Sequence, residues 1–244
     1  MPNKSIVFTL ALLLSAAARG ASYDASSNVL PGPPDFARFD FDTPVLGPLL
    51  GFNAPQSVGG GVYQMGESDV GKYTFWYNNN QVLDHTKTVE VSARLKLVSS
   101  NSGNPTDRAG LALALTDDRN FYNEFYIAPT EVFLNKRSGT TRVRDVAFAM
   151  DTTSAFHDYT FRLQGDSITI LIDGVQRLTG SIFDTAGLSG VPTLQNWASI
   201  GDITSSASGT WQMQSMSVNV FVPEPATIAG LSLLSACMLA RRVR

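Results

Sequence analysis

Residues 157–178, HDYTFRLQGDSITILIDGVQRL, decide the fold class of this chain. Apolar side chains occupy every second position from Tyr159 to Leu163 and again from Ile168 to Ile172. Such alternation is typical of a β-strand with one buried face. Gly165-Asp166 separates the two runs, and Asp173-Gly174 is a two-residue hairpin signal that leads into a further short strand. The stretch therefore predicts consecutive strands joined by tight turns.

The same period of two recurs along the middle of the chain. TVEVSARLKLV, residues 88–98, alternates apolar and polar side chains, and AGLALALT, residues 109–116, repeats the pattern. No segment between the strands shows a sustained helical period. An all-β fold is therefore expected over residues 35–221, an antiparallel β-sandwich of the jelly-roll type. Further strands are expected at 36–42, 62–65, 73–78, 121–128, 131–136, 143–149, 197–201 and 212–221.

The charge balance excludes two classes of partner. Five of the 18 Lys and Arg residues lie in the two terminal segments, which leaves 13 basic against 21 acidic residues between Ala21 and Pro225. Such an acidic domain lacks the cations that neutralise nucleic acid phosphates or bind anionic lipid. We therefore expect no nucleic acid partner. The single cysteine, Cys237, lies in the C-terminal apolar run, so the domain has no disulfide and no cysteine metal site.

The first 20 residues predict a secretory signal peptide. Lys4 gives a positive start, residues 6–18 form an apolar stretch, and Ala18 and Gly20 are the small residues that precede a cleavage site at Ala21. Residues 21–34 are rich in Ser, Asn, Gly and Pro, and we expect a disordered lead-in there.

The C-terminus predicts a short transmembrane helix over residues 226–240. These 15 residues carry no charge, and as a helix they would span about 22 Å, which is less than the roughly 30 Å of a hydrocarbon core. Arg241, Arg242 and Arg244 form a positive stop that would stay in the cytoplasm, with the domain outside.

Val222, Pro223, Glu224 and Pro225, followed by the apolar run and the arginines, resemble the PEP-CTERM sorting signal of Gram-negative bacteria. The resemblance covers residues 222–244. It implies an exported protein that is held in the inner membrane, processed near the motif by an exosortase-type membrane protease, and delivered to the cell surface or the exopolysaccharide matrix. A permanent membrane anchor is the alternative for the same segment.

Three stretches of the middle region resemble concanavalin A-like (laminin G-like) domains. FHDYTFRLQGDSITILIDGVQ, residues 156–176, is similar to their hairpin with an Asp-Gly turn, and residues 109–136 are similar to their strand-loop-strand run. Residues 198–221 resemble their closing strands, in which a Gly-rich loop precedes the last strand. The resemblance implies the sandwich fold, which serves lectins, glycosidases, adhesion modules and spacers alike.

The sequence offers no recognisable catalytic motif. The E-x-D-x-x-E run of related glycosidases is absent, and no G-x-S-x-G or H-E-x-x-H pattern occurs. His85 and His157 each precede an expected strand. The chain is therefore predicted not to be an enzyme, with no catalytic residue assigned.

NFYNEFYI, residues 120–127, is the best candidate for ligand binding. If Phe125 faces the core, then Tyr122, Glu124 and Tyr126 line the opposite face of the strand, and Trp76 is a candidate to join them. Two tyrosines beside a carboxylate suit sugar recognition, because the rings stack on C–H faces while the carboxylate accepts hydroxyl bonds. The alternative is cross-strand packing on a half-covered sheet face.

No cofactor is expected apart from a possible calcium ion, which sandwiches of the resembling family often carry at the rim on oxygen ligands. Asp40 and Asp42 on the first expected strand, and Asp202 near the last, are weak candidates for its ligands. The alternative is the ordinary role of Asp in turns, where its side chain bonds to the backbone.

Three hypotheses for function follow. The leading one is an exported, non-enzymatic protein of the surface or the exopolysaccharide matrix that binds glycan weakly. The second is a diverged glycoside hydrolase or lyase whose carboxylates converge from separate strands. The third is a purely structural or adhesive matrix protein.

Overall fold

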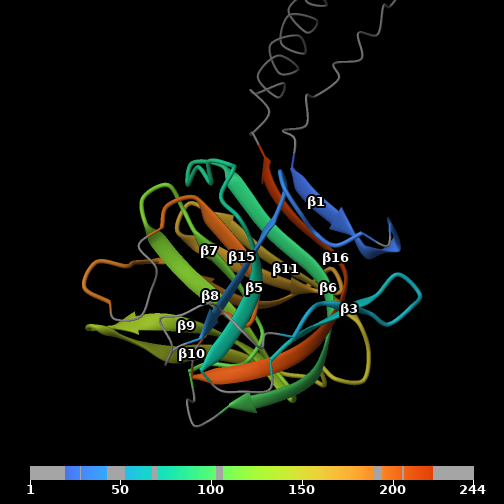
Figure 1. Ribbon diagram of the computed structural model, residues 1–244. Helices are drawn as coiled ribbons and strands as arrows, with labels where there is room; N and C mark the ends of the chain where they lie inside the picture. The colour runs from blue at the N-terminus through green and yellow to red at the C-terminus, as the bar shows by residue number, and fades with distance from the viewer. Residues whose placement is uncertain are drawn as a thin grey trace, which may run out of the picture.

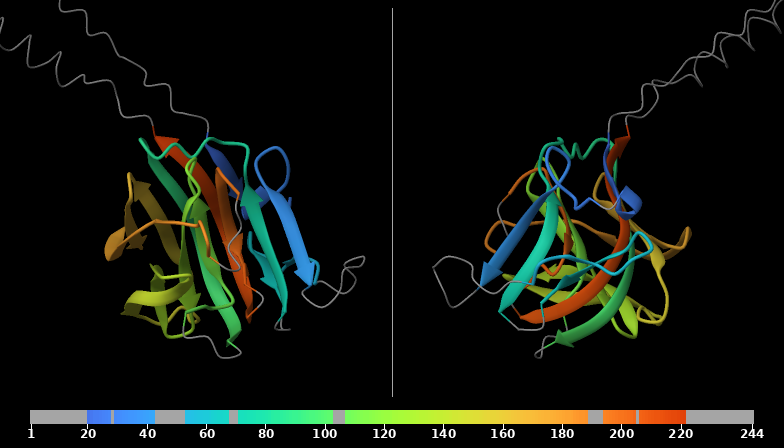
Figure 2. Two further views of the ribbon diagram at one scale, coloured as in Figure 1. Left: turned by 90° about the vertical axis from the view of Figure 1, so that its left-hand side faces the viewer. Right: turned by 45° about the vertical axis from the view of Figure 1, so that its right-hand side comes forward.

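The computed structural model describes residues 20–27, 29–42, 53–67, 71–102, 107–188, 194–204 and 206–221. These residues form two eight-stranded sheets, here called sheet A and sheet B, in which every strand pair is antiparallel. The two sheets pack as the layers of a β-sandwich (Figures 1 and 2). The predicted all-β antiparallel sandwich is thereby confirmed.

Sheet A is built around the pairing of two 15-residue strands, β6 and β16. β1 also pairs with β16, so the first and last described strands lie side by side at the top of Figure 1. The strand order is β13 (Val175–Ser181), β12 (Ser167–Ile172), β11 (His157–Gln164), β6 (Thr88–Ser102), β16 (Ala207–Phe221), β4 (Tyr63–Gly66) and β3 (Gln56–Ser57), with β1 (Ala21–Asp24) beside β16.

Sheet B contains the strand that was expected to bind ligand, β8. A two-residue strand, β14 (Phe183–Asp184), pairs with the start of β8. The strand order is β10 (Thr141–Ala149), β9 (Glu131–Ser138), β8 (Phe121–Ala128), β7 (Ala112–Thr116), β15 (Trp197–Gly201), β5 (Lys72–Asn78) and β2 (Ala37–Asp42).

The hydrophobic core lies between the two sheets and follows the predicted alternation. Val89, Val91 and Leu95 of β6 belong to it, as do Phe161 of β11 and Ile170 of β12. The Asp173-Gly174 turn closes the β12–β13 hairpin, and both residues have positive φ, 52° and 75°, as the preferred two-residue hairpin turn requires.

The lead-in expected to be disordered contains structure instead. β1 and the short 3-10 turn η1 (Ala25–Ser27) lie within residues 21–34. Ala21 and Ala25 are buried, and Tyr23 packs against the core. Pairing with β16 supplies backbone partners that the local composition does not signal, so tertiary context overrides a weak strand propensity.

The expected sorting and targeting segments lie outside the described residues. This applies to residues 1–19 of the predicted signal peptide, to the motif from Val222 to Pro225 and to the helix expected at 226–240. Within the part of the chain that the structure describes, no helix has the length and apolar character needed to cross a membrane.

Two glycines, Gly66 and Gly110, allow backbone segments to cross close to the start of β16 at one rim of the sandwich. A Cβ added to Gly110 would lie 2.0 Å from the carbonyl oxygen of Ser208, and one added to Gly66 would lie 1.9 Å from that of Gly209. Both contacts are with backbone, which cannot rotate away as a side chain can. The start of β16 therefore depends on the absence of side chains at these positions.

We predict that Gly110→Ala lowers the free energy of unfolding by about 3 kcal/mol, because the added methyl group forces backbone apart. Urea denaturation followed by circular dichroism measures the change. Gly32→Ala is the matched control, since its Cβ would meet nothing closer than 3.9 Å. Equal midpoints for the two variants would contradict the proposed crossing.

Candidate functional site

Strand β8 directs alternate side chains to the two sides of sheet B. Phe125 and Ile127 enter the core between the sheets. Tyr122 and Tyr126 belong to two smaller clusters on the other side, here called the outer face of sheet B. Glu124 lies between these tyrosines in sequence and shares their face. The structure thus places Tyr122, Glu124 and Tyr126 together, as the alternation predicts.

These three side chains are buried, so they do not form the exposed stacking surface that was expected. Tyr122, Glu124 and Tyr126 are only 1%, 2% and 0% exposed. Phe183 of β14 packs edge-on against Tyr122, and Phe133 of β9 stacks on Tyr126 with ring centroids 5.2 Å apart. The expected alternative, cross-strand packing, accounts for the tyrosine rings.

The polar atoms of the group form a network around Glu124. One carboxylate oxygen accepts a hydrogen bond from the Tyr122 hydroxyl, and the other accepts one from an Arg142 guanidinium nitrogen at 2.6 Å. Arg142 comes from β10, and its side chain extends past β9 to reach β8. The site is therefore a buried ion pair flanked by phenols, here called the Glu124–Arg142 site.

Two more arginines share this face. Arg137 of β9 lies opposite Arg142 in register and donates to the backbone carbonyls of Asp184 and Ala186 at 2.7 and 2.8 Å. Arg144 pairs with Glu131 and lies over the Phe133 ring. Three arginines of an otherwise acidic domain therefore lie close together on the outer face of sheet B. Arg142 and Arg144 are two positions apart in TRVR, and in a strand this spacing alone indicates that they share a face.

Several buried polar atoms on the same face have no hydrogen-bond partner among the residues that the structure describes. They are the Tyr126 hydroxyl, the Thr116 Oγ1, the Ser199 Oγ and the Asn135 Oδ1. The register places Thr116 opposite Tyr122, and Ser199 two strands from Glu124 through Ala114. Buried polar groups in native proteins are nearly always paired, so an unpaired group there indicates a ligand, a water molecule or a catalytic role.

The protonation states follow from burial and from the ion pair. Burial raises the pKa of the Tyr122 and Tyr126 hydroxyls well above the ordinary value, and the nearby Glu124 charge raises it further. Burial alone would lower the pKa of Arg142, but the charge of Glu124 outweighs this effect, and the pKa is raised. At neutral pH the site therefore holds two protonated phenols, which can donate protons, and a charged guanidinium.

Trp76 does not join this site. Its side chain is 4% exposed and belongs to the core between the sheets, where its indole nitrogen contacts the Met65 sulfur. Its neighbours Phe75 and Tyr77 are the residues of β5 that pack on the outer face, beside Trp197. The prediction for Trp76 is wrong, because the alternation of β5 directs it inward.

The weak calcium candidates lie apart from the site. Asp40 accepts hydrogen bonds from Arg38 and Thr74, while Asp202 donates its backbone N–H to the Thr74 carbonyl. Asp202 is fully buried, and burial raises the pKa of its carboxyl group well above the usual value, which favours the neutral acid over a cation ligand. The side chain of Asp42 is outside the described set.

Within the described ranges, one group has the spacing of metal ligands, namely Asp84, His85 and Asp118. Asp84 already pairs with Lys87 at 3.2 Å, and His85 Nδ1 lies 2.9 Å from Asp118. These internal pairs account for the group.

Comparisons with known proteins give a fold but no family. The chain matches no protein-family model, and no curated protein matches it in sequence. A carbohydrate esterase from the Shiga toxin-encoding bacteriophage phi24B is similar in structure, with a TM-score of 0.53 and 14% identity over 82% of this chain and 97% of the other. A protein of unknown function from Shewanella oneidensis MR-1 is similar with a TM-score of 0.52 and 13% identity, over 89% of this chain and 96% of the other. An alginate lyase of polysaccharide lyase family 7 is more distant, with a TM-score of 0.43 and 12% identity over 65% of this chain and 78% of the other.

At such identities the first two likenesses show the shared sandwich fold alone. The likeness to the carbohydrate esterase also corrects the prediction that the chain is not an enzyme. The same fold carries a carbohydrate esterase, so the missing E-x-D-x-x-E run does not exclude catalysis.

Asp202 allows a test that depends on pH. The pKa of Asp202 is raised in the folded state. The contribution of this carboxyl group to the free energy of unfolding is therefore fully present below its unfolded pKa of about 3.9 and is lost as the pH rises through its folded pKa. Asp202→Asn should therefore stabilise the protein at about pH 8, and the gain should vanish near pH 4. Urea denaturation at both pH values measures it.

Asp151→Asn is the control for this test. Hydrogen bonds from Thr153 lower the pKa of Asp151, so its contribution is present above the unfolded pKa and is lost as the pH falls. A destabilising effect of Asp202→Asn at about pH 8 would show instead that folding does not raise the pKa of Asp202.

Proposed function

We propose that this chain is an exported carbohydrate-active enzyme that cleaves a uronate-containing polysaccharide by β-elimination at the Glu124–Arg142 site. The observation that supports this most is the way the site holds a carboxylate. Glu124 is bound by a guanidinium and a phenol, and the Tyr126 hydroxyl lies close enough for the Glu124 charge to raise its pKa. A uronate carboxylate is the same chemical group, and it can take the place of Glu124 on Arg142.

The reaction would use each group once. Binding of the uronate carboxylate to Arg142 acidifies the neighbouring C5–H bond, because the guanidinium stabilises the charge that develops. Glu124, released from Arg142, removes that proton as the general base. The C4–O4 bond breaks, a C4–C5 double bond forms, and the leaving O4 takes the proton of Tyr126. Nothing is oxidised or reduced.

The raised pKa values fit this assignment. A phenol that stays protonated through the neutral range can serve as the acid but not as the base. Glu124 therefore takes the base role, and Tyr122, which already donates to Glu124, orients it.

Hydrolysis by two carboxylates suits this face less well. Glu131 is the other glutamate that pairs with an arginine here, and it lies opposite Ala128, four residues along β8 from Glu124. At about 3.3 Å per residue the two positions are about 13 Å apart, while glycosidases use separations of roughly 5 to 9 Å. Each glutamate is also held by a different arginine.

Substrate would enter from the Arg142 side, which is the most exposed part of the site at 9%. Phe183 covers the Tyr122 side, and Arg137 holds the segment after it through two carbonyls. In this proposal the segment moves away from β8 when a polysaccharide binds.

The place of action is proposed from the sequence. The predicted signal peptide and the PEP-CTERM-like tail support export, exosortase processing and delivery to the exopolysaccharide matrix, where a polysaccharide substrate is present. We also propose, from the same sequence resemblance, that the β-sandwich is of the concanavalin A-like type.

The test is incubation of the purified protein with polymannuronate, polyguluronate and polygalacturonate, followed by ultraviolet absorbance of the unsaturated product. Glu124→Gln and Tyr126→Phe should each slow cleavage by at least about 100-fold, the usual contribution of a general acid or base. Tyr159→Phe is the matched control, because the Tyr159 hydroxyl is also buried and unpaired but lies in the core.

Saturated products would indicate hydrolysis and contradict the elimination. Failure to cleave any of the three polymers, or full activity in Glu124→Gln, would contradict the assignment of the site.

A further inference from the structure

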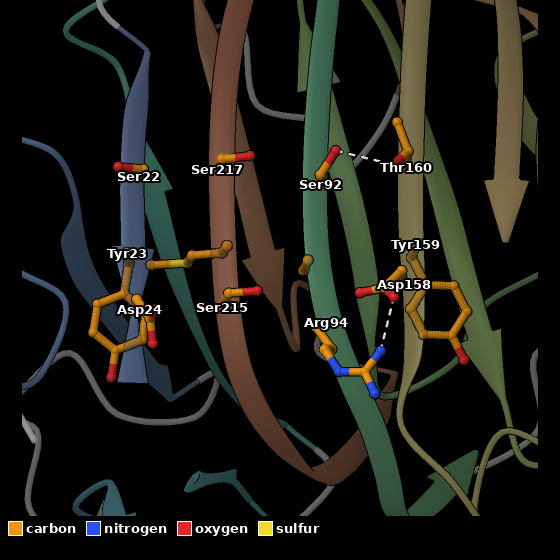
Figure 3. A pocket seen from close by; sticks show the side chains of 12 residues that line it. Ser22, Tyr23, Asp24, Ser92, Arg94, Asp158, Tyr159, Thr160, Ser215 and Ser217 are labelled. Atoms are coloured by element: carbon orange, nitrogen blue, oxygen red, sulfur yellow. Dashed lines mark hydrogen bonds and ion pairs between the residues drawn. The ribbon is translucent and has the colours of Figure 1, made fainter. Parts of the chain in front are cut away.

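A second polar surface lies on the opposite side of the molecule, on the outer face of sheet A. A groove of about 420 Å³ crosses four neighbouring strands there, β1, β16, β6 and β11 (Figure 3). Its volume is within the range of ligand pockets in proteins, about 300 to 1,000 Å³. The groove shares no residue with the Glu124–Arg142 site.

The groove contains a row of hydroxyl groups. The register places Ser22 opposite Ser217, Ser217 opposite Ser92 and Ser92 opposite Thr160, one on each strand. Figure 3 shows these four side chains side by side across the sheet. Adjacent members are therefore about 4.8 Å apart. Ser215 adds a fifth hydroxyl.

A second row next to the first carries charge. Asp24 lies opposite Ser215, Ser215 opposite Arg94, and Arg94 opposite Asp158. Arg94 pairs with Asp158 at 2.7 Å and also donates to Gln214. The lining thus contains one guanidinium and two carboxylates, and this half-exposed ion pair remains open to further hydrogen bonds.

Short side chains on the central strands create the groove. Serines occupy outward positions of β16 and β6 at its centre, while Asp24 on β1 and the Arg94–Asp158 pair lie on its two sides (Figure 3). The pattern is regular: outward positions are polar, and the intervening Ala93 and Met216 face the core.

We propose that this groove binds a neutral, hydroxyl-rich glycan chain that runs across the strands. Serine and threonine hydroxyls both donate and accept hydrogen bonds, as sugar hydroxyls do, and their spacing repeats in one direction as the sugars of a chain do. The Arg94–Asp158 pair offers a donor and an acceptor side by side. Two carboxylates against one guanidinium disfavour an anionic polysaccharide here.

This site is independent of the proposed enzyme activity. The outer face of sheet B carries arginines and suits a uronate, whereas the groove on sheet A carries hydroxyls and suits a neutral chain. Together they would hold the protein on one glycan of a matrix while it acts on another.

Affinity electrophoresis of the purified protein in gels that contain a polysaccharide tests the proposal. The probes are a neutral β-glucan and a neutral mannan, with polygalacturonate as the anionic arm and chitosan as the cationic arm. The wild-type protein should be retarded by at least one neutral polymer. Ser92→Ala/Ser217→Ala should weaken that retardation by about tenfold, because two hydrogen-bonding groups are lost.

Ser167→Ala/Thr169→Ala is the matched control, since both residues lie on β12 of the same sheet outside the groove. It should bind as the wild type does, and so should Glu124→Gln, which separates this site from the proposed catalytic one. The proposal is overturned if neither neutral polymer retards the protein, if only a charged polymer does, or if the control variant loses as much affinity as the groove variant.

Discussion

The buried ion pair between Glu124 and Arg142 is the constraint on which the outer face of sheet B depends. A charge removed from water is strongly destabilising unless it is paired and hydrogen-bonded. Removing one partner of such a buried pair lowers the free energy of unfolding by about 3 to 5 kcal/mol. The pair connects β10 to β8 across β9, and Tyr122 completes it. In the proposed function, the carboxylate and the guanidinium of this pair also bind and deprotonate a uronate, with Tyr126 as the proton donor and Tyr122 as the group that orients Glu124.

The sandwich separates stability from chemistry. Its apolar side chains fill the space between the sheets, which leaves the two outer faces free to differ. On sheet B the tyrosines are covered, and several buried polar atoms of the same face lack a hydrogen-bond partner among the described residues, while on sheet A short hydroxyl side chains leave an open groove. In our two proposals the faces bind two kinds of sugar polymer, one anionic and one neutral, and the arginines of sheet B distinguish them.

Period-two alternation in the sequence predicted the strands and correctly assigned β8, since the side of a strand on which a residue lies depends only on its position. It could not predict the burial of Tyr122 and Tyr126, because Phe183 and Phe133 reach them from strands whose neighbours depend on the sheet order. Arg142 was missed for the same reason, as it lies 18 residues from Glu124 and two strands away. The prediction for Trp76 was wrong because β5 carries aromatic residues on both of its faces, so residue type does not show which face is the outer one. The strand β1 was not predicted because it depends on pairing with β16, which is distant in sequence.

A crystal structure of the protein with a bound uronate oligosaccharide tests the central claim most directly. The account predicts that the uronate carboxylate replaces Glu124 on Arg142, that Glu124 turns toward the C5 carbon, and that the Tyr126 hydroxyl approaches O4. An intact Glu124–Arg142 pair, with the oligosaccharide bound elsewhere on the protein, would contradict it.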